Sequence, residues 1–112
     1  MLLSIITVVR NNPAGLLATY HSLLLQNCIN FEWIVQDSSD VYTPIESLSN
    51  DSPGFSIKHN FYSDFSLYNG MNIASSYAAG DWLWFVNSGD TLFSKDSVFY
   101  VSEELSRPGI NH

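Results

Sequence analysis

Residues 2–9 read Leu-Leu-Ser-Ile-Ile-Thr-Val-Val, and Arg10-Asn11-Asn12-Pro13 follow directly. A nearly continuous run of leucine and β-branched residues is typical of a strand that is covered on both faces in a parallel sheet. Asn12 can cap a helix whose first turn accepts Pro13, and this helix should end near residue 26. Apolar residues at helical spacing form its buried face: Leu16, Leu17, Tyr20, Leu23 and Leu24.

The rest of the chain repeats this alternation. We expect strands at 31–36, 56–62 and 82–86, of which 56–62 is less apolar and so lies nearer a sheet edge. Helices are expected weakly near 44–48, at 67–79 with Gly80 as the C-terminal cap, and at 95–105 with Ser94 as the N-terminal cap. This order predicts an α/β fold, an open and mostly parallel sheet with helices on both faces.

Composition limits the domain count and the partners. The chain has 112 residues and a net charge of −7, with 4 Lys and Arg against 11 Asp and Glu. A folded chain of this length buries about two-thirds of the surface that it exposes when unfolded, so we expect one domain over residues 1–112. Because no basic stripe can neutralise phosphates along a polymer, we expect no nucleic-acid partner. The acidity suits a bound cation.

Three observations bear on the compartment. Cys28 is the only cysteine, so neither an intramolecular disulfide nor a thiolate zinc site can form, and a reducing compartment is expected. The apolar start lacks a basic region and a small-residue cleavage site, which argues against a secretory signal. No apolar run approaches the roughly 20 residues of a membrane-spanning helix. We expect a cytoplasmic protein and leave open a peripheral association with the inner face of the membrane.

Candidate site residues lie where the predicted strands end, because small ligands bind at the carboxyl ends of such sheets. Asp37, Asp64 and Asp90 are expected on this one rim. Asp90 follows an aromatic strand through a Ser-Gly turn, where its carboxylate could ligate Mg²⁺ or Mn²⁺. The alternative is that these aspartates are ordinary turn formers. Neither a G-x-x-x-x-G-K-[ST] loop nor a G-x-G-x-x-G loop is present, so a diphosphate would need a metal.

Four segments, taken together and in order, resemble glycosyltransferase family 2 with the GT-A fold. They are Ser-Ile-Ile-Thr-Val-Val-Arg-Asn at 4–11, Phe-Glu-Trp-Ile-Val-Gln-Asp at 31–37, Tyr-Asn-Gly-Met-Asn at 68–72, and Gly-Asp-Trp-Leu-Trp-Phe-Val-Asn-Ser-Gly-Asp at 80–90. The motif sequences at 31–35, 68–72 and 87–90 are most similar to the colanic-acid and exopolysaccharide branch. The resemblance implies a Rossmann-like GT-A sheet, truncated to the donor-binding half of the family's domain.

By this resemblance, the protein binds a UDP- or GDP-linked sugar for sugar transfer in polysaccharide biosynthesis. Asp37 would accept a hydrogen bond from a uracil or guanine N–H, and Asp90 would hold Mn²⁺ or Mg²⁺ against the diphosphate. The residues implied to contact the nucleotide sugar are Val9, Arg10, Asn11, Asp37, Asp64, Asn72 and Ser88.

The family's acceptor site and general base come from its second half, and this chain offers no clear equivalent. Glu103 and Glu104 follow Asp90, but we expect them on the exposed side of the last helix. We therefore assign no catalytic residue, and a partner chain would supply the acceptor half. Two alternatives stay open: a non-catalytic module whose sheet edge pairs with another chain, and a receiver-like signalling domain. The latter needs an acidic pair where this chain has Arg10 and Asn11.

Overall fold

The computed structural model describes residues 3–39, 54–61, 73–92 and 94–105, which include an open four-stranded parallel sheet. The elements are β1 (Leu3–Val9), α1 (Pro13–Leu24), β2 (Phe31–Asp37), β3 (Ser56–Phe61), β4 (Trp82–Phe85) and α3 (Ser97–Leu105). The strand order is β3-β2-β1-β4, and each neighbouring pair is parallel. The predicted α/β class, the parallel sheet and the edge position of β3 are confirmed.

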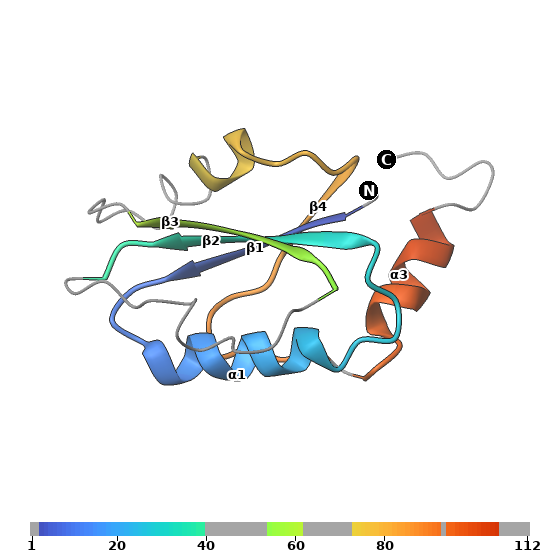
Figure 1. The fold of residues 1–112 in the computed structure, drawn as a ribbon, viewed down its shortest axis with the longest axis horizontal. Helices are drawn as coiled ribbons and strands as arrows, with labels where there is room; N and C mark the ends of the chain where they lie inside the picture. Colours follow the sequence, from blue (N-terminus) through green and yellow to red (C-terminus); the bar gives the residue numbers. More distant parts are fainter. Residues whose placement is uncertain (1–2, 40–53, 62–72, 93, 106–112) are drawn as a thin grey trace.

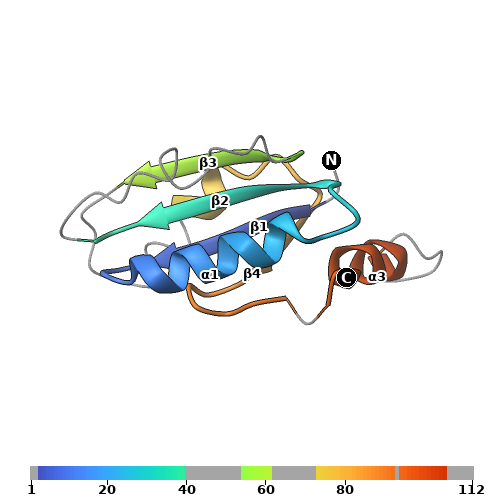
Figure 2. The same ribbon diagram turned by 60° about the horizontal axis from the view of Figure 1, so that its bottom comes forward.

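Helical segments lie on both faces of the sheet (Figure 1). α1 covers one face, and the helical residues 73–76 lie over the other. α3 lies beyond the C-terminal end of α1 (Figure 2), where the N–H of Val98 donates to Oε1 of Gln26 at 2.9 Å. Because the strands are parallel, their carboxyl ends share one edge of the sheet, and α1 begins there. That edge collects loops and a helix N-terminus, as ligand sites in such folds do.

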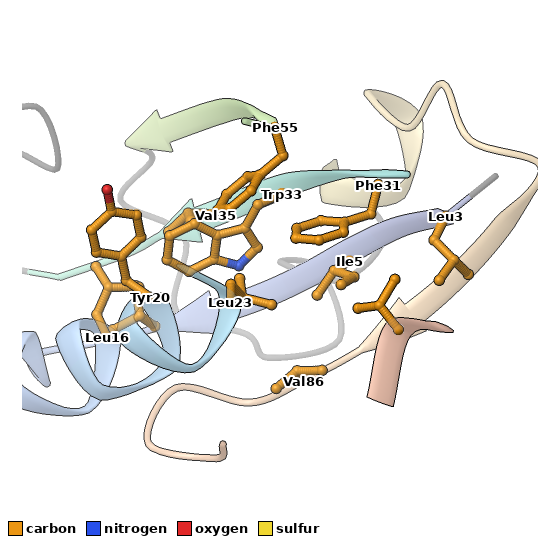
Figure 3. Close-up of a cluster of buried hydrophobic side chains, with 12 residues drawn as sticks. Leu3, Ile5, Leu16, Tyr20, Leu23, Phe31, Trp33, Val35, Phe55 and Val86 are labelled. Carbon is orange, nitrogen blue, oxygen red and sulfur yellow. The ribbon is translucent and has the colours of Figure 1, made fainter. Parts of the chain in front are cut away.

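The main core lies between the sheet and α1 (Figure 3). The Trp33 ring stacks on Tyr20 of α1, with ring centroids 5.7 Å apart. The indole N–H of Trp33 donates to Oγ1 of Thr7 at 2.9 Å, so this buried donor is satisfied. Leu16 and Leu23 add to the same face of α1 and are almost fully buried. The predicted amphipathic helix and the covered strand before it are thus confirmed.

The opposite face of the sheet holds a fully buried carboxylate. Oε2 of Glu32 accepts hydrogen bonds from Oγ of Ser4 and from the N–H of Ala79, both at 2.6 Å. Nζ of Lys58 lies 2.9 Å from Oε1. Burial alone raises the pKa of Glu32, but the hydrogen bonds from Ser4, Ala79 and Lys58 outweigh it, and the net pKa is lowered. This network ties the segment that leads into β4 to β1, β2 and β3.

Gly80 has a different role from the predicted helix cap. The described part of the helix expected at 67–79 is helical only at 73–76, so that helix ends before Gly80. The N–H of Gly80 donates to Oγ of Ser4 at 2.8 Å, and a Cβ at this position would lie 2.7 Å from backbone atoms of Leu3 and Ser4. Any side chain would collide with β1, so the close approach requires glycine.

β4 is an edge strand of the described sheet, which the sequence did not reveal. Trp82 and Trp84 pack against the α1-side core. Leu83 and Phe85 point to the other face and are 45% and 42% exposed. Among the described strands β4 pairs only with β1. An aromatic run has the same pattern at an edge as at the centre of a sheet, so periodicity could not distinguish the two positions.

The last helix begins at Ser97, two residues later than predicted. Oγ of Ser94 accepts from the N–H of Asp96 at 3.2 Å, so this serine caps the turn before the helix instead of the helix itself. Glu103 and Glu104 are exposed, as expected. The weak helix predicted at 44–48 lies outside the described residues. Within the described ranges, no helix is long and apolar enough to cross a membrane.

Candidate functional site

The loops after β1 and β2 are fastened together at the carboxyl edge of the sheet. The N–H of Ser38 donates to the carbonyl of Val9 at 2.9 Å, which carries the pairing of β1 and β2 one step beyond the strands. The N–H of Asn11 donates to Oγ of Ser39 at 2.7 Å. Asn11 has a φ of 52°, a left-handed conformation that asparagine adopts more readily than most residues. The course of the first loop is therefore set by contacts with the second.

Asp37 is the last residue of β2, and its side chain bonds to the start of the loop after β2 and to β3. Its side chain is fully buried, and Oδ1 accepts from the N–H of Ser39 at 2.9 Å. Oδ2 lies 3.2 Å from Nε2 of His59 on β3, whose side chain is 5% exposed. The register places His59 opposite Val35, two residues before Asp37. The side chains of His59 and Asp37 are therefore diagonal neighbours on the α1 side of the sheet. A ligand can contact the Asp37 carboxylate only if the side chains that bury this carboxylate move aside.

The turn at 87–90 is fastened to the first turns of α1. The N–H of Gly89 donates to the carbonyl of Gly15 at 3.0 Å and lies 3.1 Å from Oγ1 of Thr19. Oγ1 of Thr19, which is fully buried, donates to the carbonyl of Asp90 at 2.7 Å. Gly89 has a φ of 95°, a conformation that favours glycine. Thr19 thus fixes the backbone on both sides of the peptide that joins Gly89 to Asp90.

Asn12 connects the helix cap to the same turn. Its Oδ1 accepts from the N–H of Gly15 at 3.0 Å, which confirms the predicted N-cap. Its Nδ2 donates to Oγ of Ser88 at 3.1 Å. One asparagine therefore joins the start of α1 to the loop after β4, across the carboxyl edge of the sheet.

A cavity of about 810 Å³ lies beside this turn, between β4, residues 89–92 and 94, and α3. This volume is within the range of pockets that bind small molecules. Asp90 is exposed, and within the described part of the chain its carboxylate makes no hydrogen bond or ion pair. The lining residues are Trp84, Phe85, Val86, Gly89, Asp90, Thr91, Leu92, Ser94, Ser97, Tyr100 and Val101.

The structure places the other predicted contacts as follows. Arg10 and Asn11 are exposed in the loop after β1, and Ser88 is half-buried in the turn before Asp90. The side chain of Val9 is buried in the core, and its carbonyl accepts the hydrogen bond from Ser38. Asp64 and Asn72 lie outside the described residues. Asp37 does not line the cavity beside Asp90, and the sharing of one pocket by Asp37, Asp64 and Asp90 stays a prediction.

The single carboxylate residue in the cavity lining, Asp90, suits a cation that binds together with a phosphate-bearing ligand. Within residues 3–39, 54–61, 73–92 and 94–105, no three His, Cys, Asp or Glu side chains gather as a metal site. Among the described residues that line the cavity, Asp90 is the only aspartate or glutamate, and it is exposed. Mg²⁺ is commonly held by one or two carboxylates together with substrate phosphates and water. The residues present therefore fit a cation that is shared with a diphosphate.

Two residues with structural roles here were missed from the sequence. His59 stands in no sequence motif, yet it contacts Asp37 across the strands. Thr19 lies inside the predicted helix, where no motif marks it, yet its hydroxyl bonds to the backbone of Gly89 and Asp90. A polar residue on the apolar face of a helix, and a histidine on a half-apolar strand, are the only signals that could have drawn attention to them.

The sequence profile described as Glycosyl transferase family 2 matches residues 4–110. This chain belongs to glycosyltransferase family 2. Two similar curated proteins are "Uncharacterized glycosyltransferase MT1564" of Mycobacterium tuberculosis (strain CDC 1551 / Oshkosh) and "Uncharacterized glycosyltransferase Rv1514c" of Mycobacterium tuberculosis (strain ATCC 25618 / H37Rv). Each is 34% identical over 107 residues, which are 95% of this chain and 40% of the relative. The family 2 chain thus spans about two-fifths of the length of the curated relatives it matches.

Solved structures show the same fold. The crystal structure of S. aureus TarS 1-349 superposes with a TM-score of 0.79 at 20% identity, over 92% of this chain and 32% of that one. The complex of TarS 1-349 with UDP-GlcNAc gives the same TM-score and identity, over 92% of this chain and 30% of that one. The complex with UDP gives 0.76 at 20% identity, over 100% and 38%. This likeness supports the GT-A type of fold for the family 2 chain.

Proposed function

We propose that this chain binds a nucleoside-diphosphate sugar, UDP- or GDP-linked, through a divalent cation, and that the complete protein transfers the sugar in polysaccharide biosynthesis. The observation that carries the proposal is the exposed carboxylate of Asp90, which a turn fastened to α1 holds at the carboxyl edge of the sheet. TarS structures with UDP and UDP-GlcNAc share this fold and support a uridine nucleotide as the first ligand to test. The amino-acid sequences of the segments at 31–37 and 87–90 support membership of the colanic-acid and exopolysaccharide branch.

Asp90 is the proposed protein ligand of Mg²⁺ or Mn²⁺. Its backbone N–H and carbonyl are already bonded to Asn87 and Thr19, whereas its carboxylate makes no hydrogen bond to a described residue and is proposed to bind the cation beside the cavity that Asp90 lines. When bound, the cation supplies positive charge that stabilises the departing diphosphate. Arg10, exposed in the loop after β1, is proposed to donate hydrogen bonds to the phosphates.

Asp37 is proposed to select the base. N3 of uracil carries a hydrogen that a carboxylate accepts, whereas N3 of cytosine is itself an acceptor. Because Asp37 is fully buried, base binding here requires movement of the side chains that cover it. We expect UDP to bind more tightly than CDP, and Asp37→Asn to reduce this preference, because an amide can also donate to cytosine.

The acceptor half is proposed to come from further polypeptide or from a partner chain. The described residues that line the cavity include no Asp or Glu besides Asp90, and Glu103 and Glu104 are exposed on α3. Leu83 and Phe85 expose apolar surface on β4, whose outer edge pairs with no described strand. An open edge of this kind accepts another strand. The same edge favours the second candidate function, a non-catalytic module that acts through a partner.

Association with the inner face of the membrane is a further part of this proposal. A net charge of −7 disfavours attraction to anionic headgroups, so apolar contact is the available route. Phe99 and Tyr100 on α3 are 46% and 63% exposed and are the proposed contact. Sedimentation with vesicles of neutral and anionic lipid tests this, because binding that requires the anionic lipid would contradict it.

Thermal unfolding with UDP or GDP, with and without Mn²⁺, tests the proposed function. A ligand at 100 times its Kd stabilises the folded state by about 2.7 kcal/mol. We expect stabilisation by a nucleotide only with Mn²⁺, and its loss in Asp90→Asn. Asp81→Asn is the matched control, because Asp81 is also exposed but precedes β4, at the opposite edge of the sheet. Equal loss in both variants, or no stabilisation of the wild-type chain, would contradict the proposal.

A further inference from the structure

We propose that His59 is a positioning residue for nucleotide binding, and that it acts through Asp37 on the loops after β2 and β1. This inference rests on the proposed function, because it names a residue that sets the geometry of the same site. His59 is not among the residues that line the cavity beside Asp90.

The first step is the contact between the two side chains. Nε2 of His59 lies 3.2 Å from Oδ2 of Asp37, and both side chains are buried, at 5% and 0% exposure. A carboxylate oxygen accepts hydrogen bonds, and we assign the proton of this contact to Nε2 of His59, which then donates to Asp37. A hydrogen bond to a buried carboxylate holds its orientation firmly, because the alternative leaves charge without a partner.

The second step is the other oxygen of Asp37. With Oδ2 held by His59, Oδ1 faces the chain beyond β2 and accepts from the N–H of Ser39 at 2.9 Å. This is the geometry of an Asx turn, in which an aspartate fixes the backbone two residues ahead. Without His59, the carboxylate can rotate, and the turn at Ser39 loses its fixed acceptor.

The third step carries the effect to the first loop. Oγ of Ser39 accepts from the N–H of Asn11 at 2.7 Å, and Asn11 has the left-handed φ of 52°. A residue in this conformation depends on its surroundings to stay there. Arg10 and Asn11 are the exposed residues proposed to meet the nucleotide. The contacts therefore run from β3 through the end of β2 to the binding loop after β1.

Two variants separate positioning from simple packing. His59→Leu keeps a side chain of similar bulk but removes the donor, whereas His59→Gln places an amide N–H near the position of Nε2. His21→Leu is the matched control, because His21 is exposed on α1. The dissociation constants of UDP and GDP with Mn²⁺ are measured by calorimetry, and each variant's thermal midpoint is recorded separately.

We expect His59→Leu to weaken binding of the preferred nucleotide by about tenfold, which corresponds to about 1.4 kcal/mol. His59→Gln should recover most of this affinity, and His21→Leu should bind like the wild-type chain. Equal affinity in His59→Leu and wild type would overturn the positioning role and leave the proposed function standing. Equal loss in the leucine and glutamine variants would also overturn it, because the donor would then not matter.

A measurement on the unaltered chain covers the case in which His59→Leu does not fold. Nitrogen NMR of the histidine rings should show the proton of His59 on Nε2, and addition of UDP with Mn²⁺ should shift the amide signals of Ser39 and Asn11. A His59 ring protonated only on Nδ1, or unmoved Ser39 and Asn11 signals in a complex that calorimetry shows to form, would overturn the inference. Absence of any nucleotide binding by the wild-type chain would overturn the proposed function and this inference together.

Discussion

Replacing Glu32 with glutamine should lower the free energy of unfolding by about 2 to 3 kcal/mol. The carboxylate accepts two hydrogen bonds at 2.6 Å, from Ser4 and Ala79, and faces Lys58 at 2.9 Å. Hydrogen bonds to a charged acceptor contribute about 1.5 to 3 kcal/mol each, and those to a neutral one about 0.5 to 1.5. Glutamine can keep the bonds to Ser4 and Ala79 only in neutral form, at a loss of about 1 kcal/mol each. Because Lys58 is 41% exposed, the lost ion pair adds at most about 1 kcal/mol.

The same change should alter the acid limb of the stability curve. The pKa of Glu32 is lower in the folded chain than its ordinary value, so the unfolded state binds more protons at acidic pH. The stabilisation from Glu32 is therefore fully present above the ordinary glutamate range, about pH 4 to 4.5, and is lost as the pH falls through the lowered value. Glu32→Gln has no proton to gain there, and its stability should fall less steeply.

Urea unfolding of wild type and variant between pH 3 and 7 measures both effects. Glu103→Gln is the matched control, since Glu103 is exposed on α3, and should change stability by less than about 0.5 kcal/mol. If Glu32→Gln were as stable as this control, or if its acid limb had the slope of the wild type, the assigned network would be wrong.

Three backbone-related substitutions have distinct expected results. Thr19→Val keeps the shape of the side chain but removes the hydroxyl that bonds Gly89 and Asp90. Urea unfolding should therefore show a free energy of unfolding lower by about 1 to 2 kcal/mol, and UDP with Mn²⁺ should stabilise the variant less than the wild type. An unchanged response would refute the role of Thr19. Gly80→Ala should cost about 2 to 3 kcal/mol by the same assay, because its Cβ meets β1 at 2.7 Å, and a neutral result would disprove that contact. Gly89→Ala should cost about 1 to 2 kcal/mol in the same assay because φ is 95°, and an unchanged stability would contradict the left-handed turn.

The order of strands and helices could be predicted because local patterns encode it. The apolar run at 2–9 predicts a strand and the capped segment after it predicts a helix, and the structure confirms both. The β4 segment shows the limit, because sequence defines a strand but not its neighbours, and this strand is at an edge. Gly80 shows another, since glycine is favoured equally by a helix cap and by close packing.

The candidate site could be predicted only as a set of strand ends. The parallel sheet brings these ends to one edge, so the expectation for Asp37 and Asp90 followed from topology. The contact of His59 with Asp37 depends on the register of β3 against β2, which no local pattern reports. Burial of Asp37 was hidden for the same reason, since a strand-end aspartate can point to solvent or into the sheet.

A crystal of the chain grown with UDP and Mn²⁺, with data collected at the manganese absorption edge, tests the central claim most directly. The account predicts one anomalous peak bonded to the carboxylate of Asp90 and to oxygens of both phosphates, with the base over the carboxyl ends of β1 and β2. A manganese peak bound to other side chains, or a nucleotide lying away from this edge while Asp90 faces water, would contradict it.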